Sequence, residues 1–212
     1  MASARRPRIG LLGGSFDPPH LAHLALGRLA QITLGLDELR WLPAGAPWQK
    51  ADRQMATAEH RAGMLSALLA DEPQCVIDSR ELLRDGATYS IDTVRELQAE
   101  RPDADWFLII GQDQYAHLDS WRDWPELLER LTLAVAGRDG QLPQAGTALA
   151  AHPHRMLSLP LARQDISASQ IRRQLAAGTP AQALLALVGE AVAGYIDQHQ
   201  PYPKGAAKED RH

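Results

Sequence analysis

A chain of 212 residues with 45% hydrophobic and 23% charged residues has the composition of an ordinary globular protein and can bury one substantial core. Its formal net charge of −4 gives no electrostatic support for binding a nucleic-acid polymer, although a local pocket can still attract a small anion. The single cysteine, Cys75, excludes an internal disulfide, and no apolar run reaches the length of a membrane span or a signal-peptide core. We expect one cytoplasmic domain over residues 1–200 and a polar, disordered tail over 201–212.

The first predicted elements are a short strand over residues 9–12 and a helix that begins near His20. The apolar run is too short to form a helix, and Gly13 and Gly14 end it. These glycines allow a sharp turn of the backbone and the close approach of another molecule. His20 and His23 are three residues apart, so they share one face of the helix near its N-terminus. A strand that ends in glycines and leads into a helix N-terminus is suited to hold phosphate.

Further along the chain, short apolar runs alternate with segments of helical periodicity, which predicts an α/β fold. The clearest strand, 106–111, is apolar throughout, and this indicates burial on both faces, as in a parallel sheet. The other expected strands are 39–43, 75–77, 131–136 and 156–159; the expected helices are 20–34, 57–70 and 90–100, with helical segments from 166 to 198; and a loop is expected over 141–151. We therefore expect a Rossmann-like, doubly wound, mainly parallel sheet with helices on both faces and a small helical C-terminal part.

In such a sheet the ligand binds beyond the carboxyl ends of the strands, at the point where the strand order reverses. Glycine and polar residues follow three expected strands, at 13–15, 111–113 and 137–138, so we expect these segments to line one crevice. Neither a G-x-x-x-x-G-K-[ST] loop nor a G-x-G-x-x-G turn after the first strand is present. Phosphate must then be held by helix N-termini, histidines and arginines.

A second segment able to hold phosphate spans residues 165–173. Ser167, followed three residues later by Gln170, matches a capping box that begins a helix. Ser169 and the free N–H groups of the first turn would face an anion, and Arg172 would add a positive charge beside it. Taken alone, this pattern more often marks only a well-capped surface helix.

The two histidines of the first helix also have plainer interpretations. They could be polar residues at the start of a helix, or a pair of metal ligands. Metal binding by the chain is weakly supported, because no further histidine or cysteine has a matching spacing, and His152 and His154 lie in an expected loop without a partner. We therefore expect no metal held by protein ligands alone.

The segments GGSFDPPHLAH and ISASQIR, in this order near opposite ends of the chain, resemble the paired signature of the nucleotidyltransferase α/β-phosphodiesterase superfamily. The usual forms of that signature are GG-[ST]-F-D-P-x-H-x-G-H and I-S-[SA]-[ST]-x-I-R. Within the superfamily, the middle of the chain resembles the bacterial nicotinate-nucleotide adenylyltransferases; the matching pieces are PWQK at 47–50, TYSIDT at 88–93, FLIIGQD at 107–113 and Trp121. Three positions depart from the family pattern: Ala22, Gln49 and Ala168.

The resemblance implies an enzyme that joins ATP and nicotinate mononucleotide into deamido-NAD and pyrophosphate, without a covalent intermediate. The attacking phosphate is already an anion at neutral pH, so catalysis needs positioning and charge neutralisation rather than a general base. Mg²⁺ is the implied cofactor, held mainly by the ATP phosphates. The nearest alternative is another superfamily enzyme, such as pantetheine-phosphate adenylyltransferase; an aminoacyl-tRNA synthetase fragment and a non-catalytic nucleotide-binding regulator are less well matched.

The resemblance also implies the site residues. The expected catalytic residues are His20, His23 and Arg172. The same three are expected to bind ATP together with Gly13, Gly14, Ser15, Phe16, Gly111, Asp113, Ser167 and Ser169. The expected nicotinate-nucleotide site consists of Lys50, Thr88, Tyr89, Trp121 and Arg138. For Trp121, core packing is the alternative to stacking on the pyridine ring, and with Trp124 close by only one of the two indoles needs to face the ligand.

Overall fold

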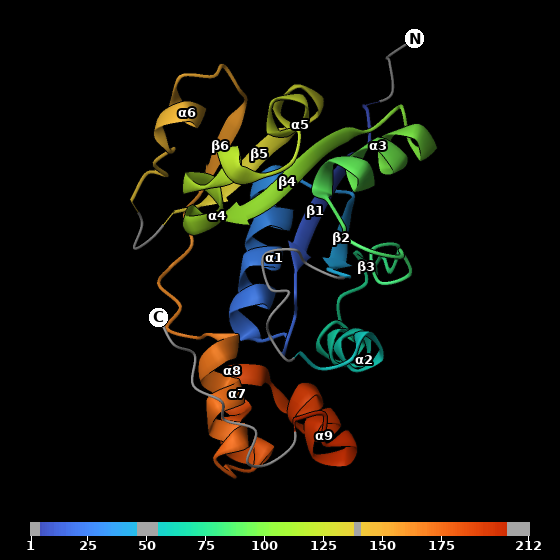
Figure 1. Cartoon of the computed structure of the whole chain (residues 1–212), viewed down its shortest axis with the longest axis vertical. Coiled ribbons are helices and arrows are strands. Elements are labelled where there is room, and N and C mark those ends of the chain that lie inside the picture. Colours follow the sequence, from blue (N-terminus) through green and yellow to red (C-terminus); the bar gives the residue numbers. More distant parts are fainter. Residues whose placement is uncertain (1–4, 46–54, 138–140, 203–212) are drawn as a thin grey trace.

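A single parallel sheet organises the protein (Figure 1). The computed structural model describes residues 5–45, 55–137 and 141–202. Within these residues the strand order is β3-β2-β1-β4-β5-β6, and each neighbouring pair is parallel. The strands are β1 (Arg8–Gly14), β2 (Glu38–Pro43), β3 (Cys75–Ile77), β4 (Asp105–Gly111), β5 (Thr132–Ala136) and β6 (Met156–Leu159). The strand order reverses between β1 and β4, which confirms the doubly wound fold and its expected switch point.

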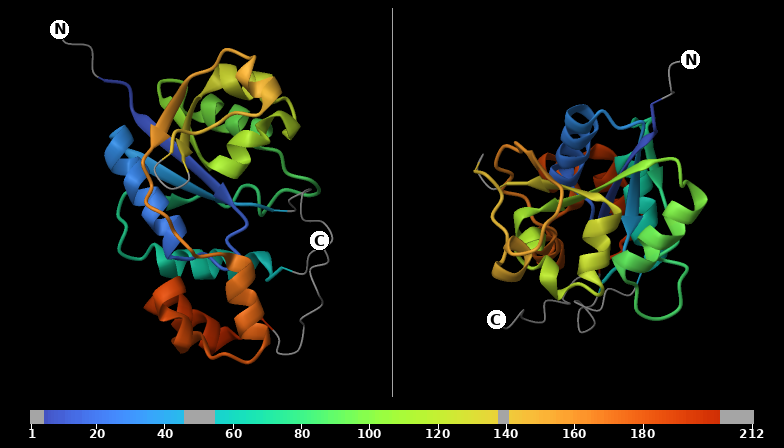
Figure 2. Two further views of the ribbon diagram at one scale, coloured as in Figure 1. Left: turned by 90° about the vertical axis from the view of Figure 1, so that its left-hand side faces the viewer. Right: turned by 90° about the horizontal axis from the view of Figure 1, so that it is seen from above.

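Helices cover both faces of the sheet (Figure 2). The helix α1 lies on one face, and α3, α4 and α5 lie on the other. The helices are α1 (Leu21–Leu34), α2 (Ala58–Leu68), α3 (Ser90–Glu100), α4 (Gln112–Ala116), α5 (Trp124–Arg130), α6 (Thr147–Ala150), α7 (Ala168–Ala176), α8 (Leu185–Val188) and α9 (Glu190–His199), with 3₁₀ turns η2 (Leu118–Ser120) and η3 (Ala181–Leu184). None of the helices within the described ranges has the length and apolar character needed to cross a bilayer.

The alternation of side chains along β4 explains its uninterrupted apolar sequence. Leu108 and Ile110 belong to the core shared with α3 and α5, whereas Phe107 and Ile109 belong to the core shared with α1. Because both faces of this central strand are buried, neither needs polar side chains. The predicted burial of residues 106–111 on both faces is therefore confirmed.

The C-terminal helices form a third layer together with α2, beyond the end of β1 (Figures 1 and 2). Ile171 and Leu175 of α7, Val192 of α9 and Met64 of α2 are buried in one apolar cluster. This layer is the expected helical C-terminal part. Its position beyond β1 matters for the site, because it brings α7 next to the turn that follows that strand.

Most predicted elements lie within one or two residues of the observed ones, and β3, α3 and β6 coincide with them. The loop predicted over residues 141–151 is wrong in part, because Thr147–Ala150 form α6, anchored by the fully buried Leu149. The helices α4 and α5 and the turn η2 were absent from the prediction, since such short elements give little periodicity. The helix α7 begins at Ala168, whereas the helical segments were expected from Ile166, because Ser167 caps it.

Replacing Gly27 of α1 by alanine tests how closely this helix packs on the sheet. A Cβ at Gly27 would lie 2.7 Å from the rigid ring of the buried Trp41. We expect Gly27→Ala to lower the free energy of unfolding in urea by about 1–3 kcal/mol. Gly194→Ala in α9 is the control: a Cβ there meets no atom within 4 Å, so it should raise stability by about 0.5–1 kcal/mol. Equal stabilities of the two variants would contradict the close packing.

Candidate active site

The turn between β1 and α1 reverses the chain at Phe16, not at the glycines. Gly13 and Gly14 both belong to β1, and the left-handed backbone conformation occurs at Phe16, with φ of 47°. The prediction of a sharp turn at the two glycines is therefore wrong. The Phe16 side chain is buried and contacts the rings of His23 and Trp41, at centroid distances of 5.1 and 5.5 Å. This burial offsets the cost of an unusual backbone conformation for a residue with a side chain.

The glycines at the strand ends have different structural roles. A Cβ at Gly14 would lie 3.1 Å from the Phe16 ring, so this glycine lets the ring pack against the backbone. A Cβ at Gly13, by contrast, would meet no atom within 4 Å, and the same holds for Gly111 at the end of β4. Because β1 and β4 are neighbours, Gly13 and Gly111 leave open space beside two adjacent strand ends, where a ligand can approach the backbone closely.

The two histidines stack on each other at the start of α1. His20 is the N-cap and His23 the third helical residue, and their ring centroids are 3.7 Å apart. The backbone N–H of His20 donates to Nδ1 of His23 at 3.2 Å, so a neutral His23 carries its proton on Nε2. Only 6% of His20 is exposed, and its Nδ1 has no hydrogen-bond partner within the described residues. Burial lowers the pKa of His20 to about 4, so this imidazole is neutral at pH 7.

Arg172 connects the two predicted phosphate-binding segments, although they lie far apart in sequence. Ser167 accepts a hydrogen bond from the N–H of Gln170 at 3.2 Å, which confirms it as the N-cap of α7. From this helix, Nη1 of Arg172 donates to the backbone carbonyl of Asp17 at 2.5 Å, and Nη2 donates to Ser169 Oγ at 3.4 Å. The N-terminus of α7 therefore lies against the β1–α1 turn, and both segments border one site.

Arg61 of α2 fastens the ends of β1 and β2 together from the interior. Its guanidinium donates to the carbonyl oxygens of Ser15 at 2.9 Å and Ala44 at 2.7 Å through Nη1. It also donates to Gly45 through Nη2 and to Ala56 through Nε, both at 3.3 Å. Only 2% of Arg61 is exposed, and this burial lowers the pKa of its guanidinium below the usual value, although it remains a cation.

The sequence interpretation did not assign roles to Asp17 and Arg61, yet both are buried at the site. Nη1 of Arg172 lies 3.6 Å from Oδ2 of Asp17, so a buried carboxylate faces the guanidinium. The sequence does contain a pattern that predicts the burial of Arg61: it precedes Met64 and Leu65 by three and four residues, so it shares their buried helix face. Asp17 lies within the GGSFDPPHLAH segment itself.

The expected nicotinate side lies next to this cluster. Thr88 is buried, and its Cγ2 would lie 3.0 Å from a Cβ at Gly45, beside the end of β2. Tyr89 is the N-cap of α3, and the guanidinium of Arg122 lies 4.7 Å from the centroid of its ring. The neighbouring Trp121 is partly buried against the core. Its stacking on a ligand stays a prediction.

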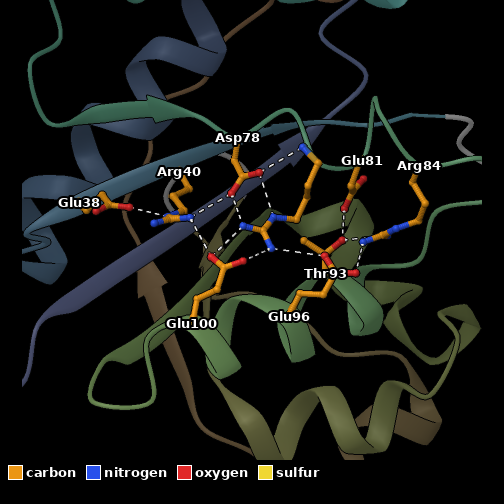
Figure 3. Close-up of polar contacts among 9 residues, drawn as sticks. Glu38, Arg40, Asp78, Glu81, Arg84, Thr93, Glu96 and Glu100 are labelled. Carbon is orange, nitrogen blue, oxygen red and sulfur yellow. Dashed lines mark hydrogen bonds and ion pairs between the residues drawn. The ribbon is translucent and has the colours of Figure 1, made fainter.

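A polar network holds the segment before Thr88 against α3 (Figure 3). The hydroxyl of Thr93 on α3 donates to Oε1 of the buried Glu81 at 2.8 Å and accepts from Arg84 at 3.3 Å. Asp78 in turn accepts from Arg40 of β2 at 3.0 Å. Burial raises the pKa of Glu81 above its usual value. The network joins the segment 78–84, which precedes Thr88, both to β2 of the sheet and to the first turns of α3.

Comparison with known proteins identifies the family. Residues 11–174 match the family model described as cytidylyltransferase-like. The chain is 50% identical over 208 residues to a probable nicotinate-nucleotide adenylyltransferase of Methylibium petroleiphilum, covering 97% of this chain and 98% of the relative. A protein of the same name from Bordetella petrii is 46% identical over 200 residues, with 92% and 98% covered. The chain belongs to the nicotinate-nucleotide adenylyltransferase family.

Solved structures of two adenylyltransferases have the same fold as this chain. The nicotinic acid mononucleotide adenylyltransferase of Plasmodium falciparum complexed with NaAD superposes with a TM-score of 0.72 at 18% sequence identity, covering 92% of this chain and 97% of that one. A putative nicotinate-nucleotide adenylyltransferase from Vibrio parahaemolyticus gives a TM-score of 0.65 at 16% identity, with 92% and 95% covered. At such identities the likeness concerns the arrangement of strands and helices.

Of the remaining predicted site residues, the structure describes Asp113 but not Lys50 or Arg138. Asp113 lies in the first turn of α4, two residues after Gly111, at the expected edge of the sheet. Lys50 and Arg138 lie outside the described residues. A cavity of about 480 Å³ is lined by Arg6, Trp106, Thr132 and Arg155, among others, at the amino ends of the strands. It is on the opposite edge of the sheet from the expected site and does not form part of it.

The buried, neutral state of His20 predicts a distinct pH dependence of stability. Its pKa is about 4 in the folded protein and 6.5 in an unfolded chain, so the unfolded state binds the proton first as pH falls. This contribution to stability is complete above pH 6.5 and is lost between pH 6.5 and 4. In urea denaturation, wild type should lose about 2–3 kcal/mol more than His20→Gln on going from pH 7 to pH 4. Parallel pH profiles would show that His20 is not buried as a neutral group.

Proposed function

We propose that this protein joins ATP and nicotinate mononucleotide to give deamido-NAD and pyrophosphate, a step of NAD biosynthesis in the cytoplasm. The observation that carries the proposal is the contact of Arg172 with the β1–α1 turn, because it unites the two phosphate-binding segments at the switch point of the sheet. The names of relatives at 50% and 46% identity support the same substrates. The open backbone at Gly13 and Gly111 supports a nucleotide site there.

The chemistry fits a site without a general base. The mononucleotide phosphate is already an anion, and it attacks the α-phosphorus of ATP in line, so the protein must position the two anions and offset their charge. A neutral His20 offsets this charge as a hydrogen-bond donor rather than as a cation, and His23 offers a second donor, the N–H at Nε2. Arg172 adds a guanidinium from the side of α7, next to the carboxylate of Asp17.

The ATP molecule extends from the carboxyl ends of β1 and β4, at Gly13 and Gly111, to the N-terminus of α7. Gly13, Gly14, Ser15 and Phe16 surround the adenylate end, and Gly111 and Asp113 contact the ribose or adenine. The outer phosphates meet the N-terminus of α7, where Ser167, Ser169 and the free N–H groups of the first turn favour an anion. Support for this placement comes from the open space at the strand ends and from the position of α7 beside the turn.

The nicotinate mononucleotide binds on the side of α3. The first-turn N–H groups that follow Tyr89 favour a carboxylate, which suits nicotinate rather than its amide. Thr88 and Tyr89 hold this carboxylate, and Trp121 stacks on the pyridine ring. Lys50 and Arg138 contact the mononucleotide from segments outside the described residues.

Mg²⁺ enters as part of the ATP complex. Within the described ranges, no group of three or more His, Cys, Asp or Glu side chains is placed to hold a metal ion. In this proposal the ion is held mainly by the ATP phosphates and water, consistent with its preference for hydrated oxygen ligands. When bound, it neutralises charge on the departing pyrophosphate. The protein residues still supply the orientation of both phosphates.

A pyrophosphate-release assay tests this function. Wild-type protein is incubated with ATP and Mg²⁺ together with nicotinate mononucleotide, nicotinamide mononucleotide or phosphopantetheine, and we expect release with nicotinate mononucleotide to be fastest. His20→Ala should lower turnover by at least about 100-fold, because it removes a donor that stabilises developing charge. Its melting temperature shows whether it folds. Release with phosphopantetheine alone would favour the alternative adenylyltransferase, and release with none of the three would refute the function.

A further inference from the structure

The carboxylate of Asp17 is held in one orientation by groups from three parts of the chain. It is 1% exposed, and its Oδ1 accepts hydrogen bonds from the N–H of Ala56 at 3.2 Å and the hydroxyl of Tyr202 at 2.9 Å. Oδ2 has no hydrogen-bond partner within the described residues and lies 3.6 Å from Nη1 of Arg172. The two donors on Oδ1 thus direct Oδ2 toward the guanidinium.

Tyr202 reaches this carboxylate from the C-terminal side of α9. Its ring packs against the apolar cluster of α2 and α7–α9, and its hydroxyl also lies 3.8 Å from Sδ of Met64. Burial, followed by the negative charge of Asp17, raises the pKa of Tyr202 far above its usual value. The hydroxyl therefore stays protonated and donates to Oδ1. Tyr202 falls within the region expected to be a disordered tail, of which 203–212 lie outside the described residues.

We propose that Tyr202 is a positioning residue for adenylyl transfer: its hydroxyl orients Asp17, and Asp17 orients the guanidinium of Arg172 toward the triphosphate. The inference rests on the proposed function. An arginine side chain has many rotamers, and fixing it before the substrate binds avoids an entropic cost during the reaction. Without the hydroxyl, the N–H of Ala56 is the one donor to Oδ1 that remains among the described residues, and the carboxylate and guanidinium can turn together.

A matched control separates positioning from simple loss of a hydrogen bond. The hydroxyl of Tyr195 in α9 lies 3.2 Å from Nδ1 of His60 in α2. Tyr195→Phe therefore removes a tyrosine hydroxyl from the same helical layer, but no described contact links Tyr195 to Asp17 or Arg172. A merely structural role for Tyr202 predicts similar behaviour of the two phenylalanine variants.

The experiment measures kcat and KM for each substrate, the affinity for a non-hydrolysable ATP analogue by calorimetry, and the melting temperature. We expect Tyr202→Phe to lower kcat/KM for ATP by about tenfold, and the analogue affinity by a smaller factor, while KM for nicotinate mononucleotide changes less than about twofold. Tyr195→Phe should stay within about twofold of wild type in every kinetic constant. In an Asp17→Ala background, Tyr202→Phe should cause no further loss, because the group it orients is gone.

Several outcomes would overturn the proposal. Wild-type kinetics in Tyr202→Phe, or equal losses in the two phenylalanine variants, would leave Tyr202 with only a structural role. A loss that persists in the Asp17→Ala background would show that Tyr202 does not act through Asp17. If the wild-type protein is active and Tyr202→Phe has the same kinetic constants, this inference is refuted while the proposed function stands. A wild-type protein that neither releases pyrophosphate nor binds the analogue refutes the proposed function and this inference together.

Discussion

The site depends on two arginines, the buried Arg61 and the partly buried Arg172, that hold the turn after β1 from two sides. Arg61 of α2 binds the carbonyl oxygen of Ser15, and Arg172 of α7 binds that of Asp17. Both arginines come from the layer formed by α2 and the C-terminal helices rather than from the sheet. A doubly wound sheet supplies a crevice at its switch point, but here the added helical layer shapes that crevice and brings a cation to it.

The electrostatics of this arrangement suit a site that must receive two anions and still fold without them. Several unpaired buried cations would destabilise the empty protein. The described site instead combines a neutral His20 and backbone N–H groups at helix N-termini with two compensated arginines. Arg61 donates to four carbonyl oxygens, and Arg172 faces the carboxylate of Asp17. The helix N-termini add positive potential through dipoles, which cost little to bury when they are hydrogen-bonded in place.

The sequence predicted the architecture because strand and helix signals alternate clearly, and β3, α3 and β6 coincide with the prediction. It did not predict the turn at Phe16, where burial of a ring overrides the usual preference for glycine. It also did not predict the contacts of Asp17 with Arg172 and Tyr202, because these residues are 155 and 185 positions apart and only tertiary packing joins them. Local patterns carry no information on such distant pairs.

In the proposed binding mode, the adenylate end of ATP lies in the open space beside Gly13, and the outer phosphates reach the N-terminus of α7. The most direct test is the affinity of Gly13→Ala for a non-hydrolysable ATP analogue, measured by calorimetry beside its melting temperature. We expect an affinity at least about tenfold weaker, with the melting temperature within about 2 °C of wild type, because the new Cβ would meet the ligand but no protein atom within 4 Å. Wild-type affinity in this variant would place the adenylate end elsewhere and contradict the proposed nucleotide site.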